Sequence, residues 1–428
     1  MQGNNMAEIT QPGNEEKLFY GWIIVLASFG INAVVHGIRY SYGVFFKSLG
    51  GEFDLTRTMT SGISCVYWVL SAACALLGGW LLDKYGPRKI AITMGLLTAV
   101  SLIATGRAGA SWQLLFSYSL LLAAGTGAVY SVLMATIQRW FHKKRGLAVG
   151  IVSSGVGIGT IVMMPLTAYL IPILDWRTTY LMMGLVLGAI FIILSLPLKS
   201  DPAAIGLLPD GAKQSLNTAA VNTRNASGDN SLPLSQALKT VNFWMLAFIW
   251  FLWGFSLLLV LTHFVPHLTD LGIPATTAAL ISGLIGVISI AGRLGFGWVS
   301  DRLDRKLATT IAIILQAGPL FLLAWAQQLW MFYLFAAIYA IGYGGIDPTT
   351  LALAGDIFGT RYLGKILGAL LLFWPLGAGA GSIVGGIIFD ATGSYFSAFL
   401  LVASAMLAAC VCALLIKREN GKTHPNLM

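Results

Sequence analysis

Charged residues are scarce in this chain. Asp, Glu, Lys and Arg make up 10% of its 428 residues and hydrophobic residues 57%, whereas soluble proteins carry about 25% charged residues. This composition excludes an ordinary soluble enzyme and indicates a protein that crosses a membrane many times. The formal net charge of +9 does not indicate binding to nucleic acid, because the basic residues lie in short loops between apolar segments.

Cysteine is nearly absent as well. The four cysteines lie in apolar segments without metal-ligand spacing, so we expect them to pack as small apolar side chains. No zinc motif, catalytic triad or nucleotide loop stands out, and we expect neither enzymatic activity nor a bound metal or cofactor. The first 19 residues are polar and lack the features of a cleaved signal peptide, so the first apolar segment should remain as a transmembrane helix.

Apolar segments of about 20 residues, the length that crosses a bilayer, recur along the chain. They predict an all-α membrane protein with twelve transmembrane helices, near residues 20–47, 59–82, 90–108, 112–136, 146–171, 177–197, 241–264, 276–300, 307–326, 329–354, 363–388 and 395–416. The polar stretch 199–240 predicts a flexible linker between two halves. The expected units are a tail (1–19), a six-helix bundle (20–198), the linker (199–240), a second six-helix bundle (241–416) and a tail (417–428).

The basic residues predict the orientation in the membrane. With an even number of helices both chain ends lie on one side, and 20 of the 26 Lys and Arg residues fall there, with 4 on the other side and 2 inside helices. The positive-inside rule then predicts that both ends and the linker are cytoplasmic. We expect the membrane to be a bacterial inner membrane. We expect the protein to function as a monomer.

Two loops, one in each half, have similar sequences. GGWLLDKYGPRK (78–89) follows the second helix and GFGWVSDRLDRK (295–306) follows the eighth, and in each an Asp stands four residues after a Gly and before a basic cluster. Equivalent loops indicate an internal repeat, as in transporters whose two similar bundles rock around a central site.

The first loop resembles the signature loop of the major facilitator superfamily, carried by Gly79, Asp83, Gly86, Arg88 and Lys89, and the second is a degenerate copy. Further segments resemble the branch of monocarboxylate transporters and oxalate–formate antiporters: FYGWIIVLASF (19–29), RWFHKKRGLAVG (139–150), NFWML (242–246) and GDIFG (355–359). The resemblance covers nearly the whole chain except its ends and the linker. It implies a carrier that works by alternating access, with proton symport of lactate, pyruvate or similar anions, or with anion exchange.

The repeated loops are also predicted to act as a gate on the cytoplasmic side. Asp83 and Asp301 can contact nearby helix ends and basic residues, with Arg88 and Arg305 in the same loops. Such contacts would hold the outward-open state and break when the inner side opens. The alternative is that these loops only set the orientation of the helices in the membrane.

One residue interrupts the apolar helix near 276–300. Arg293 lies eight residues before Asp301, about 12 Å inside the helix end. A charge near the bilayer centre costs about 2.5–3.5 kcal/mol by the lowest estimates, and a guanidinium can hold both oxygens of a carboxylate. We therefore predict that Arg293 binds the carboxylate of the substrate, as the resemblance also implies. Pairing with a neighbouring carboxylate or with helix carbonyls, for stability, is the alternative.

The resemblance does not carry over to the proton path. Ser289 stands where animal monocarboxylate transporters have an Asp, and Tyr40 stands where they have a Lys in the first helix. The second central cation of the oxalate carrier, a Lys in the eleventh helix, has no counterpart near Ala378. One central cation favours a monocarboxylate over oxalate.

Three residues are candidates for proton coupling. Asp347 lies inside the tenth helix, nine residues before Asp356, and an unpaired carboxylate at that depth is expected to hold a proton; a packing role beside Pro348 is the alternative. His36 in the first helix can titrate near neutral pH, and the neighbouring Arg39 can attract anions to the outer mouth or close an outer gate. For these two, a solvated outer vestibule is the alternative.

Aromatic residues are predicted to line the substrate cavity. A Tyr hydroxyl can donate to a carboxylate while its ring walls off the cavity, and ordinary helix packing is the alternative. The candidates are Tyr40, Tyr130, Tyr343, Phe373 and Trp374.

Together these patterns predict a secondary active transporter that moves a small monocarboxylate, of the lactate or pyruvate type, with a proton. A carboxylate exchanger of the oxalate–formate type is the first alternative. A receptor built on a transporter fold and a drug exporter are further alternatives, and a central Arg suits anions better than cationic drugs.

Overall fold

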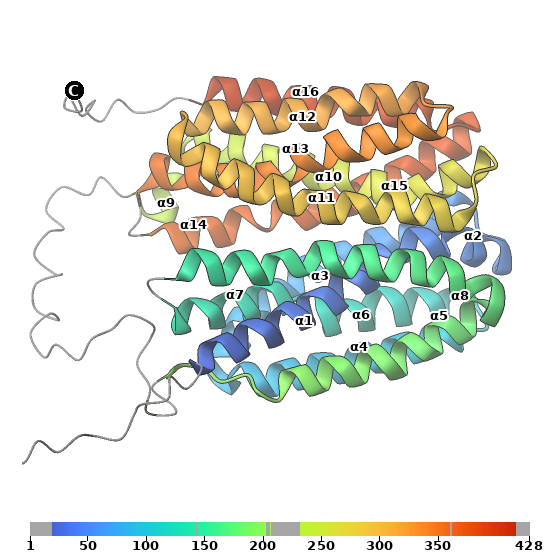
Figure 1. Cartoon of the computed structure of the whole chain (residues 1–428), viewed down its shortest axis with the longest axis horizontal. Coiled ribbons are helices and arrows are strands. Elements are labelled where there is room, and N and C mark those ends of the chain that lie inside the picture. Colours follow the sequence, from blue (N-terminus) through green and yellow to red (C-terminus); the bar gives the residue numbers. More distant parts are fainter. Residues whose placement is uncertain (1–18, 142–143, 203–205, 207–231, 360–361, 417–428) are drawn as a thin grey trace, which may run out of the picture.

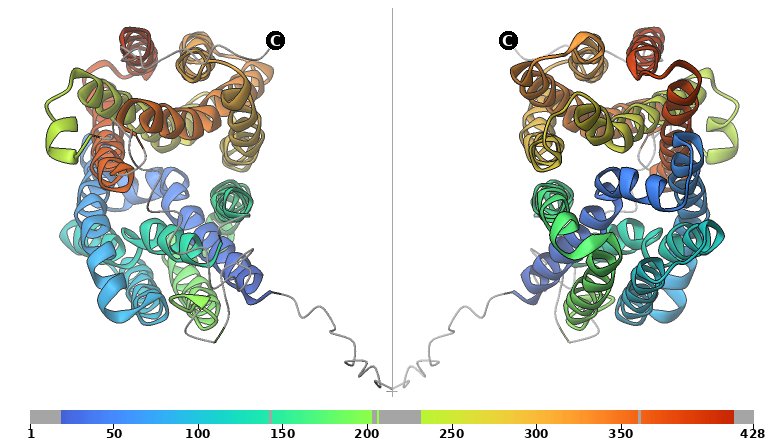
Figure 2. Two further views of the ribbon diagram at one scale, coloured as in Figure 1. Left: turned by 90° about the vertical axis from the view of Figure 1, so that its left-hand side faces the viewer. Right: turned by 90° about the vertical axis from the view of Figure 1, so that its right-hand side faces the viewer.

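The computed structural model describes residues 19–141, 144–202, 206, 232–359 and 362–416. Its helices run roughly parallel in two bundles, one formed by each half of the chain (Figure 1). The end views in Figure 2 show the two bundles as separate groups of helices that face each other. The first described helix begins and the last one ends at the same end of the molecule. We call this end the terminal face and the opposite end the far face.

The first half makes six crossings between these faces. They are α1 (Tyr20–Tyr40) with α2 (Tyr42–Glu52); α3 (Arg57–Tyr85); α4 (Pro87–Gly106); a composite of α5 (Ser111–Leu114), the π-helix η1 (Leu115–Leu121), α6 (Leu122–Thr126) and α7 (Val129–Trp140); and α8 (Arg145–Ser195), which counts twice. In α8 the chain reverses at Asp175, whose φ of 68° and ψ of 156° are not helical. The fifth and sixth helices therefore meet at one residue, with no loop between them.

The second half also makes six crossings. The short α9 (Leu234–Ala237) precedes them, and they are α10 (Val241–Asp270), α11 (Ala275–Arg302), α12 (Arg305–Trp325), α13 (Leu329–Phe358), α14 (Leu363–Leu370) with α15 (Phe373–Thr392), and α16 (Phe396–Leu415). The described residues contain 11 apolar runs long enough to cross a membrane. Because α8 crosses twice, the predicted twelve helices are confirmed. The tails and most of the linker lie outside the described residues, so their boundaries stay predictions.

The chain forms helices because apolar segments in lipid must satisfy their backbone hydrogen bonds internally. Polar residues set several helix starts: the side chain of Thr56 accepts from the Met59 N–H at 3.2 Å, and that of Asp304 from the Leu307 N–H at 3.1 Å. Three of the spans are interrupted within the bundle, at Ser41, at Gly127–Ala128 and at Leu371–Leu372. These interruptions prove important for the site.

The two halves pack closely between the middle of the bundle and the far face. Helix α8 meets α11, and α3 meets α15. A Cβ atom on Gly157 would collide with the carbonyl of Gly286, and one on Gly386 would lie 2.6 Å from the carbonyl oxygen of Arg57. Glycine is therefore needed at these contacts, since any side chain would push the halves apart.

Ion pairs also join the halves at the far face. The carboxylate of Asp270 lies 2.7 Å from both Lys47 Nζ and an Arg57 guanidinium nitrogen. The carboxylate of Asp390 accepts from the backbone N–H groups of Arg57 at 3.1 Å and Thr58 at 2.8 Å, and so caps the start of α3. Lys47, Arg57 and Thr58 belong to the first half, whereas both carboxylates belong to the second.

Toward the terminal face the same helices separate. Gly146 and Gly297 each lie 11 residues from one of the touching glycines, Gly157 and Gly286. Three helical turns return a residue to the same helix face, yet a Cβ atom on Gly146, Gly150 or Gly297 would meet nothing within 4 Å. The interface is thus closed at the far face and open at the terminal face.

Candidate functional site

A cavity of about 180 Å³ lies between the halves at the depth of the interrupted helices. This is well above the roughly 10–15 Å³ that a cavity needs in order to hold one water, so a small organic anion fits. Eight of the residues singled out in the sequence line the cavity: His36, Arg39, Tyr40, Tyr130, Arg293, Tyr343, Asp347 and Trp374. They come from both halves, so the structure brings together residues that are far apart in the sequence.

Arg293 and Asp347 form an ion pair in the wall of this cavity. The Arg293 Nη1 atom lies 3.1 Å from Asp347 Oδ2, and Nη2 donates to the Tyr343 hydroxyl at 3.2 Å. Gly344 permits the close approach of α13 to α11, because a Cβ atom there would lie 2.1 Å from the Ser289 carbonyl oxygen and 3.0 Å from the Arg293 backbone nitrogen. Tyr343 and Asp347 are four residues apart and share a helix face. Arg293 therefore has the carboxylate partner that the alternative interpretation required.

This pairing leaves Arg293 able to bind more. A guanidinium has five N–H donors, and the contacts above use two of them. The Arg293 and Asp347 side chains are 15% and 17% exposed, which leaves both reachable from the cavity. Arg293 can thus exchange Asp347 for another carboxylate without moving far.

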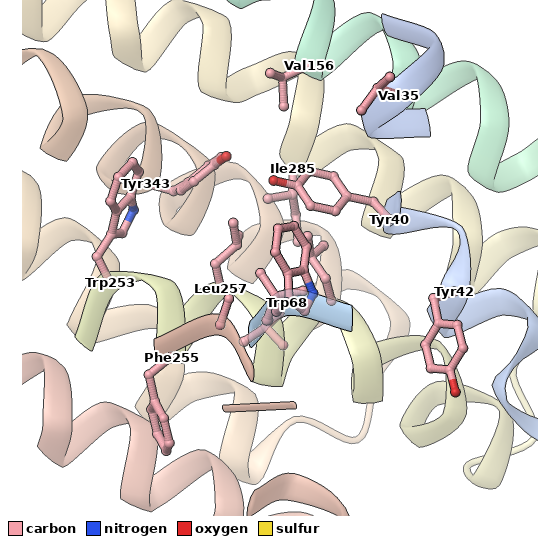
Figure 3. Close-up of a cluster of buried hydrophobic side chains, with 14 of the residues drawn as sticks. Val35, Tyr40, Tyr42, Trp68, Val156, Trp253, Phe255, Leu257, Ile285 and Tyr343 are labelled. Carbon is pink, nitrogen blue, oxygen red and sulfur yellow. The ribbon is translucent and has the colours of Figure 1, made fainter. Parts of the chain in front are cut away.

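Three tyrosine hydroxyls gather around this pair. In Figure 3 the hydroxyls of Tyr40 and Tyr343 point toward each other across the boundary between the halves. Tyr130, from α7 of the first half, lies close enough to interact with Asp347 and Arg293 and has Ser153 as a hydrogen-bonding neighbour. The three tyrosines thus line the same cavity as Arg293, and their contact with a substrate stays a prediction.

The location inferred for Arg39 and His36 was wrong. Each side chain is only 7% exposed, and both line the central cavity rather than a solvated outer vestibule. The reason is that the first span continues through α2 to Glu52 and is 33 residues long, so residues 36–40 lie near its middle. The cavity therefore has two central cations, Arg39 and Arg293, and the premise of one central cation, which favoured a monocarboxylate over oxalate, is wrong.

Arg39 is held by uncharged partners. It donates to the carbonyl oxygen of Thr126 at 2.5 Å, and its guanidinium carbon lies 5.8 Å and 5.4 Å from the ring centres of Tyr67 and Trp68. Its Nε atom is buried without a hydrogen-bond partner. His36 accepts from or donates to no carboxylate in the described part of the chain; its Nδ1 lies 3.0 Å from the carbonyl oxygen of Asn32.

Tryptophans that the sequence did not single out form one side of the cavity. Trp68, Trp250 and Trp253 line it beside Trp374. The ring centres of Trp374 lie 5.3 Å from Trp68 and 5.9 Å from Trp253, and Trp253 also packs on Tyr343 at 5.7 Å. No pattern in the sequence identified these residues, because α3 and α10 are apolar on several faces.

Phe373 is not among the cavity-lining residues of the described chain. Its ring packs at 6.0 Å from that of Trp244, while the next residue, Trp374, faces the cavity. Adjacent residues on a helix point about 100° apart, so only one of this pair can do so. The prediction for Phe373 as a cavity residue is therefore wrong.

Of the four predicted gate residues, the structure describes the side chains of Arg88 and Arg305. Arg305 pairs with Asp356 at 2.5 Å and donates to the Ala352 carbonyl at 3.2 Å, both within the second half, and Arg88 is exposed. The side chains of Asp83 and Asp301 lie outside the described residues, so the gate remains a prediction. Among the described residues no group of three or more His, Cys, Asp or Glu could hold a metal ion.

Comparison with known proteins agrees with this architecture. The model of the family described as Major Facilitator Superfamily matches residues 26–326 and 268–427. Monocarboxylate transporter 13 of Rattus norvegicus is 25% identical over 391 residues, covering 91% of this chain and 87% of that protein. The oxalate:formate antiporter of Oxalobacter formigenes is 25% identical over 406 residues, covering 94% and 92%.

Solved structures show the same fold. A D-xylose–proton symporter superposes with a TM-score of 0.75 at 16% identity, covering 95% of this chain and 100% of that one. A bacterial homologue of the human lysosomal transporter Spinster, in an inward-facing conformation, gives 0.67 at 16% identity, covering 94% and 96%.

Proposed function

The chain belongs to the major facilitator superfamily, and from that premise we propose that it moves a small monocarboxylate, of the lactate or pyruvate type, together with a proton. It is a multi-pass membrane transporter and not an enzyme. The observation that carries the proposal is the Arg293–Asp347 ion pair in the cavity wall. Because Asp347 already pairs with Arg293, it competes with an anionic substrate for the guanidinium.

The competition couples the two cargoes. While Asp347 is ionised it holds Arg293, and an incoming carboxylate would have to share one guanidinium with it. A proton on Asp347 removes that charge and releases Arg293 to make the two-pronged contact with the substrate. Substrate and proton therefore bind together more favourably than either does alone.

Charge counting supports this scheme. Adding a proton and a monocarboxylate leaves the net charge of the cavity wall unchanged, so the loaded and the empty carrier present the same charge to the membrane. A proton alone adds a positive charge to a wall that already holds Arg39 and Arg293, which is costly at this depth. The protonated carrier without substrate is thus disfavoured.

The tyrosines complete the substrate site. The Tyr343 hydroxyl accepts from Arg293, so its own proton is free to be donated to a carboxylate oxygen. Tyr40 and Tyr130, both from the first half, line the same cavity. A bound anion would then contact both halves, which is what an alternating-access cycle requires.

For the orientation, we propose that the terminal face is cytoplasmic, in a bacterial inner membrane, and that the monomer is the working unit. The supporting observation is the bias of basic residues toward that side. On this orientation the cavity of the present structure opens to the cytoplasm.

Exchange of carboxylates is the second candidate function. It is favoured by Arg39: with Asp347 ionised, the wall carries one net positive charge, and a single carboxylate neutralises it without a proton. The similarity to an oxalate:formate antiporter points the same way.

The test is uptake of labelled L-lactate into proteoliposomes, with and without an inward proton gradient. We expect gradient-driven accumulation by the native chain, its loss in Asp347→Asn, and loss of all uptake in Arg293→Ala. Glu52→Gln is the matched control, since Glu52 pairs with Arg177 within the first half and lies away from the cavity. Accumulation that survives in Asp347→Asn would disprove the coupling role. Uptake that ignores the gradient but is stimulated by internal carboxylate would establish the exchanger.

A further inference from the structure

His263 lies in α10 between the cavity and the far face, where the two halves are in contact. It stands seven residues before Asp270, the last residue of α10, about 10 Å inside the helix end, and it is fully buried. Gly385 makes room for the ring, because a Cβ atom there would collide with it. From the first half, Phe46 packs on the ring at 5.3 Å and the Ser61 hydroxyl lies 3.4 Å from Nε2. The imidazole is therefore part of the interface between the halves.

Both ring nitrogens of His263 have a hydrogen-bond partner, and these partners determine which nitrogen carries the hydrogen. Nε2 lies 2.8 Å from the carbonyl oxygen of Ser382, which can only accept, so Nε2 is the donor. In the neutral ring Nδ1 is then an acceptor, and the Tyr395 hydroxyl donates to it at 3.1 Å. Neutral His263 therefore satisfies both of its nitrogens without a further proton.

The Tyr395 hydroxyl also links His263 to Arg57, the first residue of α3. Arg57 Nη1 donates to the same hydroxyl oxygen at 2.6 Å, and the guanidinium carbon lies 3.6 Å from the ring centre of Phe389. Arg57 belongs to the first half, whereas Tyr395 and Phe389 belong to the second. One hydroxyl thus accepts from a cation that joins the two halves and donates to the imidazole.

A proton on His263 is incompatible with this arrangement. It would go to Nδ1, the ring nitrogen without a hydrogen, and would meet the hydrogen that the Tyr395 hydroxyl directs at the same atom. The hydroxyl would have to turn its hydrogen away, and its oxygen would then lie between two cations, the imidazolium and the Arg57 guanidinium. Protonation of His263 therefore weakens a contact that holds the halves together.

No negative charge is in place to offset an imidazolium. Among the described residues no carboxylate contacts the His263 ring, since Asp270 pairs with Lys47 and Arg57, and Asp390 accepts from the start of α3. A buried cation without a paired anion is costly. The charged and titratable groups around the ring are Arg57 from α3, Lys47 from α2, Asp390 from α15, Tyr395 before α16, and His267 and Asp270 from α10 itself.

We propose that His263 is a second proton-binding site, distinct from Asp347, and that its protonation separates the two halves at the far face. Opening of the far face moves Arg57 away from Tyr395 and lets water reach the imidazole, which then titrates near neutral pH. The open form takes up a proton that the closed form cannot hold, so acid shifts the equilibrium toward the open form. The site involves no substrate and does not rest on the proposed function.

The size of the effect follows from the linkage between proton binding and conformation. An imidazole in water has a pKa of about 6.5. If only the open form takes the proton, the ratio of open to closed protein rises about 30-fold between pH 8 and pH 5. Any proton binding by the closed form reduces this figure, so we expect an increase of at least about tenfold.

The experiment measures the distance between the halves at the far face by double electron–electron resonance, on the full-length protein in lipid nanodiscs without substrate. Spin labels are attached through Gly51→Cys and Thr276→Cys, two exposed positions at the far face, in a chain whose four native cysteines are replaced by alanine. The ratio of long to short distances should rise at least about tenfold from pH 8 to pH 5. No increase, or an increase confined to pH values below about 4.5, where carboxylates titrate, would overturn the proposal.

Matched variants assign the response to this histidine. His263→Gln can still donate to Ser382 and His263→Asn can still accept from Tyr395, and in both the ratio should change by less than about twofold with pH. His267→Gln, one turn along α10, should keep the response, because the His267 ring packs on aromatic rings of the second half. Asp347→Asn should keep it as well, which separates this site from the proton site of the proposed function. A native response in the two His263 variants, or its loss in His267→Gln or Asp347→Asn, would overturn the proposal.

Discussion

The interface between the two halves differs sharply between its ends. From the cavity to the far face, glycines bring backbone against backbone, and ion pairs join the rims. From the cavity to the terminal face, glycines on the same helix faces meet nothing. The same helices, α8 and α11, are thus in contact at one end and apart at the other, so they must rock about the cavity for the open end to close.

The difference also indicates which contacts stabilise the state that is closed at the far face. At the far face, direct backbone packing leaves no room for adjustment, whereas the ion pairs there are partly exposed and individually weak. Disturbing the packed glycines should therefore have a larger effect than removing a charge, and removing a charge a larger effect than screening it.

The largest effect is expected from Gly157→Leu. A side chain here collides with the backbone of Gly286, and overpacking of a tight contact typically costs about 1–3 kcal/mol. We expect transport in proteoliposomes to be lost and the far end to be forced apart. Gly150→Leu, on the same helix face but with open space around it, should remain folded and keep the far end closed; equal damage by both substitutions would contradict the difference between the two ends.

The next largest effect is expected in the labelling rates of cysteines introduced at the two ends of the interface. In a chain whose four native cysteines are replaced by alanine, Gly297→Cys should react with a maleimide added from the terminal face. Gly286→Cys should react on the order of tenfold more slowly or less, because it is reached only by local opening. Labelling rates that are the same at the two sites would refute the asymmetry.

A moderate effect is expected from Asp270→Asn, which removes both ion pairs across the far face. Partly exposed pairs are worth about 0.2–1 kcal/mol each, so the population with the far face open should rise a few-fold. Spin labels at Gly51 and Thr276 would report the distance between the halves by double electron–electron resonance. Glu52→Gln breaks an equally short pair to Arg177 within the first half, and the same distance distribution should not change.

The smallest effect is expected from salt. At about 1 M ionic strength the screening length is roughly 3 Å, so the exposed pairs at Asp270 weaken while the glycine contacts do not. The same spin-label distance should shift slightly toward the open far face in the native chain. It should not shift in Asp270→Asn, and a shift of equal size there would show that the ion pairs are not its source.

Much of this arrangement could be predicted from the sequence. Twelve apolar spans, the depth of Arg293 and the position of Asp347 follow from helix length and from the cost of charge in lipid. The pairing of Arg293 with Asp347 depends on the close approach of α11 and α13 at Gly344. A single sequence does not reveal which helices approach each other.

The errors have physical causes as well. Arg39 was placed too far out because the first span was ended at residue 47, whereas it continues through an interruption at Ser41 to Glu52. Trp68 and Trp253 could not be found because their helices are apolar on nearly every side, and such helices carry no periodic signal for the cavity face. Phe373 and Trp374 could not be told apart without the break at Leu371–Leu372 that fixes the rotation of α15.

The interrupted helices have a mechanical consequence. An intact helix transmits a bend along its whole length, but a helix with missing backbone hydrogen bonds bends at that point. Breaks at Ser41, Gly127–Ala128 and Leu371–Leu372 lie beside the cavity, and they divide three spans into an inner and an outer lever. On the terminal side, α7 and α14 can pivot at these breaks while the segments of the same spans nearer the far face stay packed. The substrate can then be enclosed from the terminal side before the contacts between the halves at the far face separate.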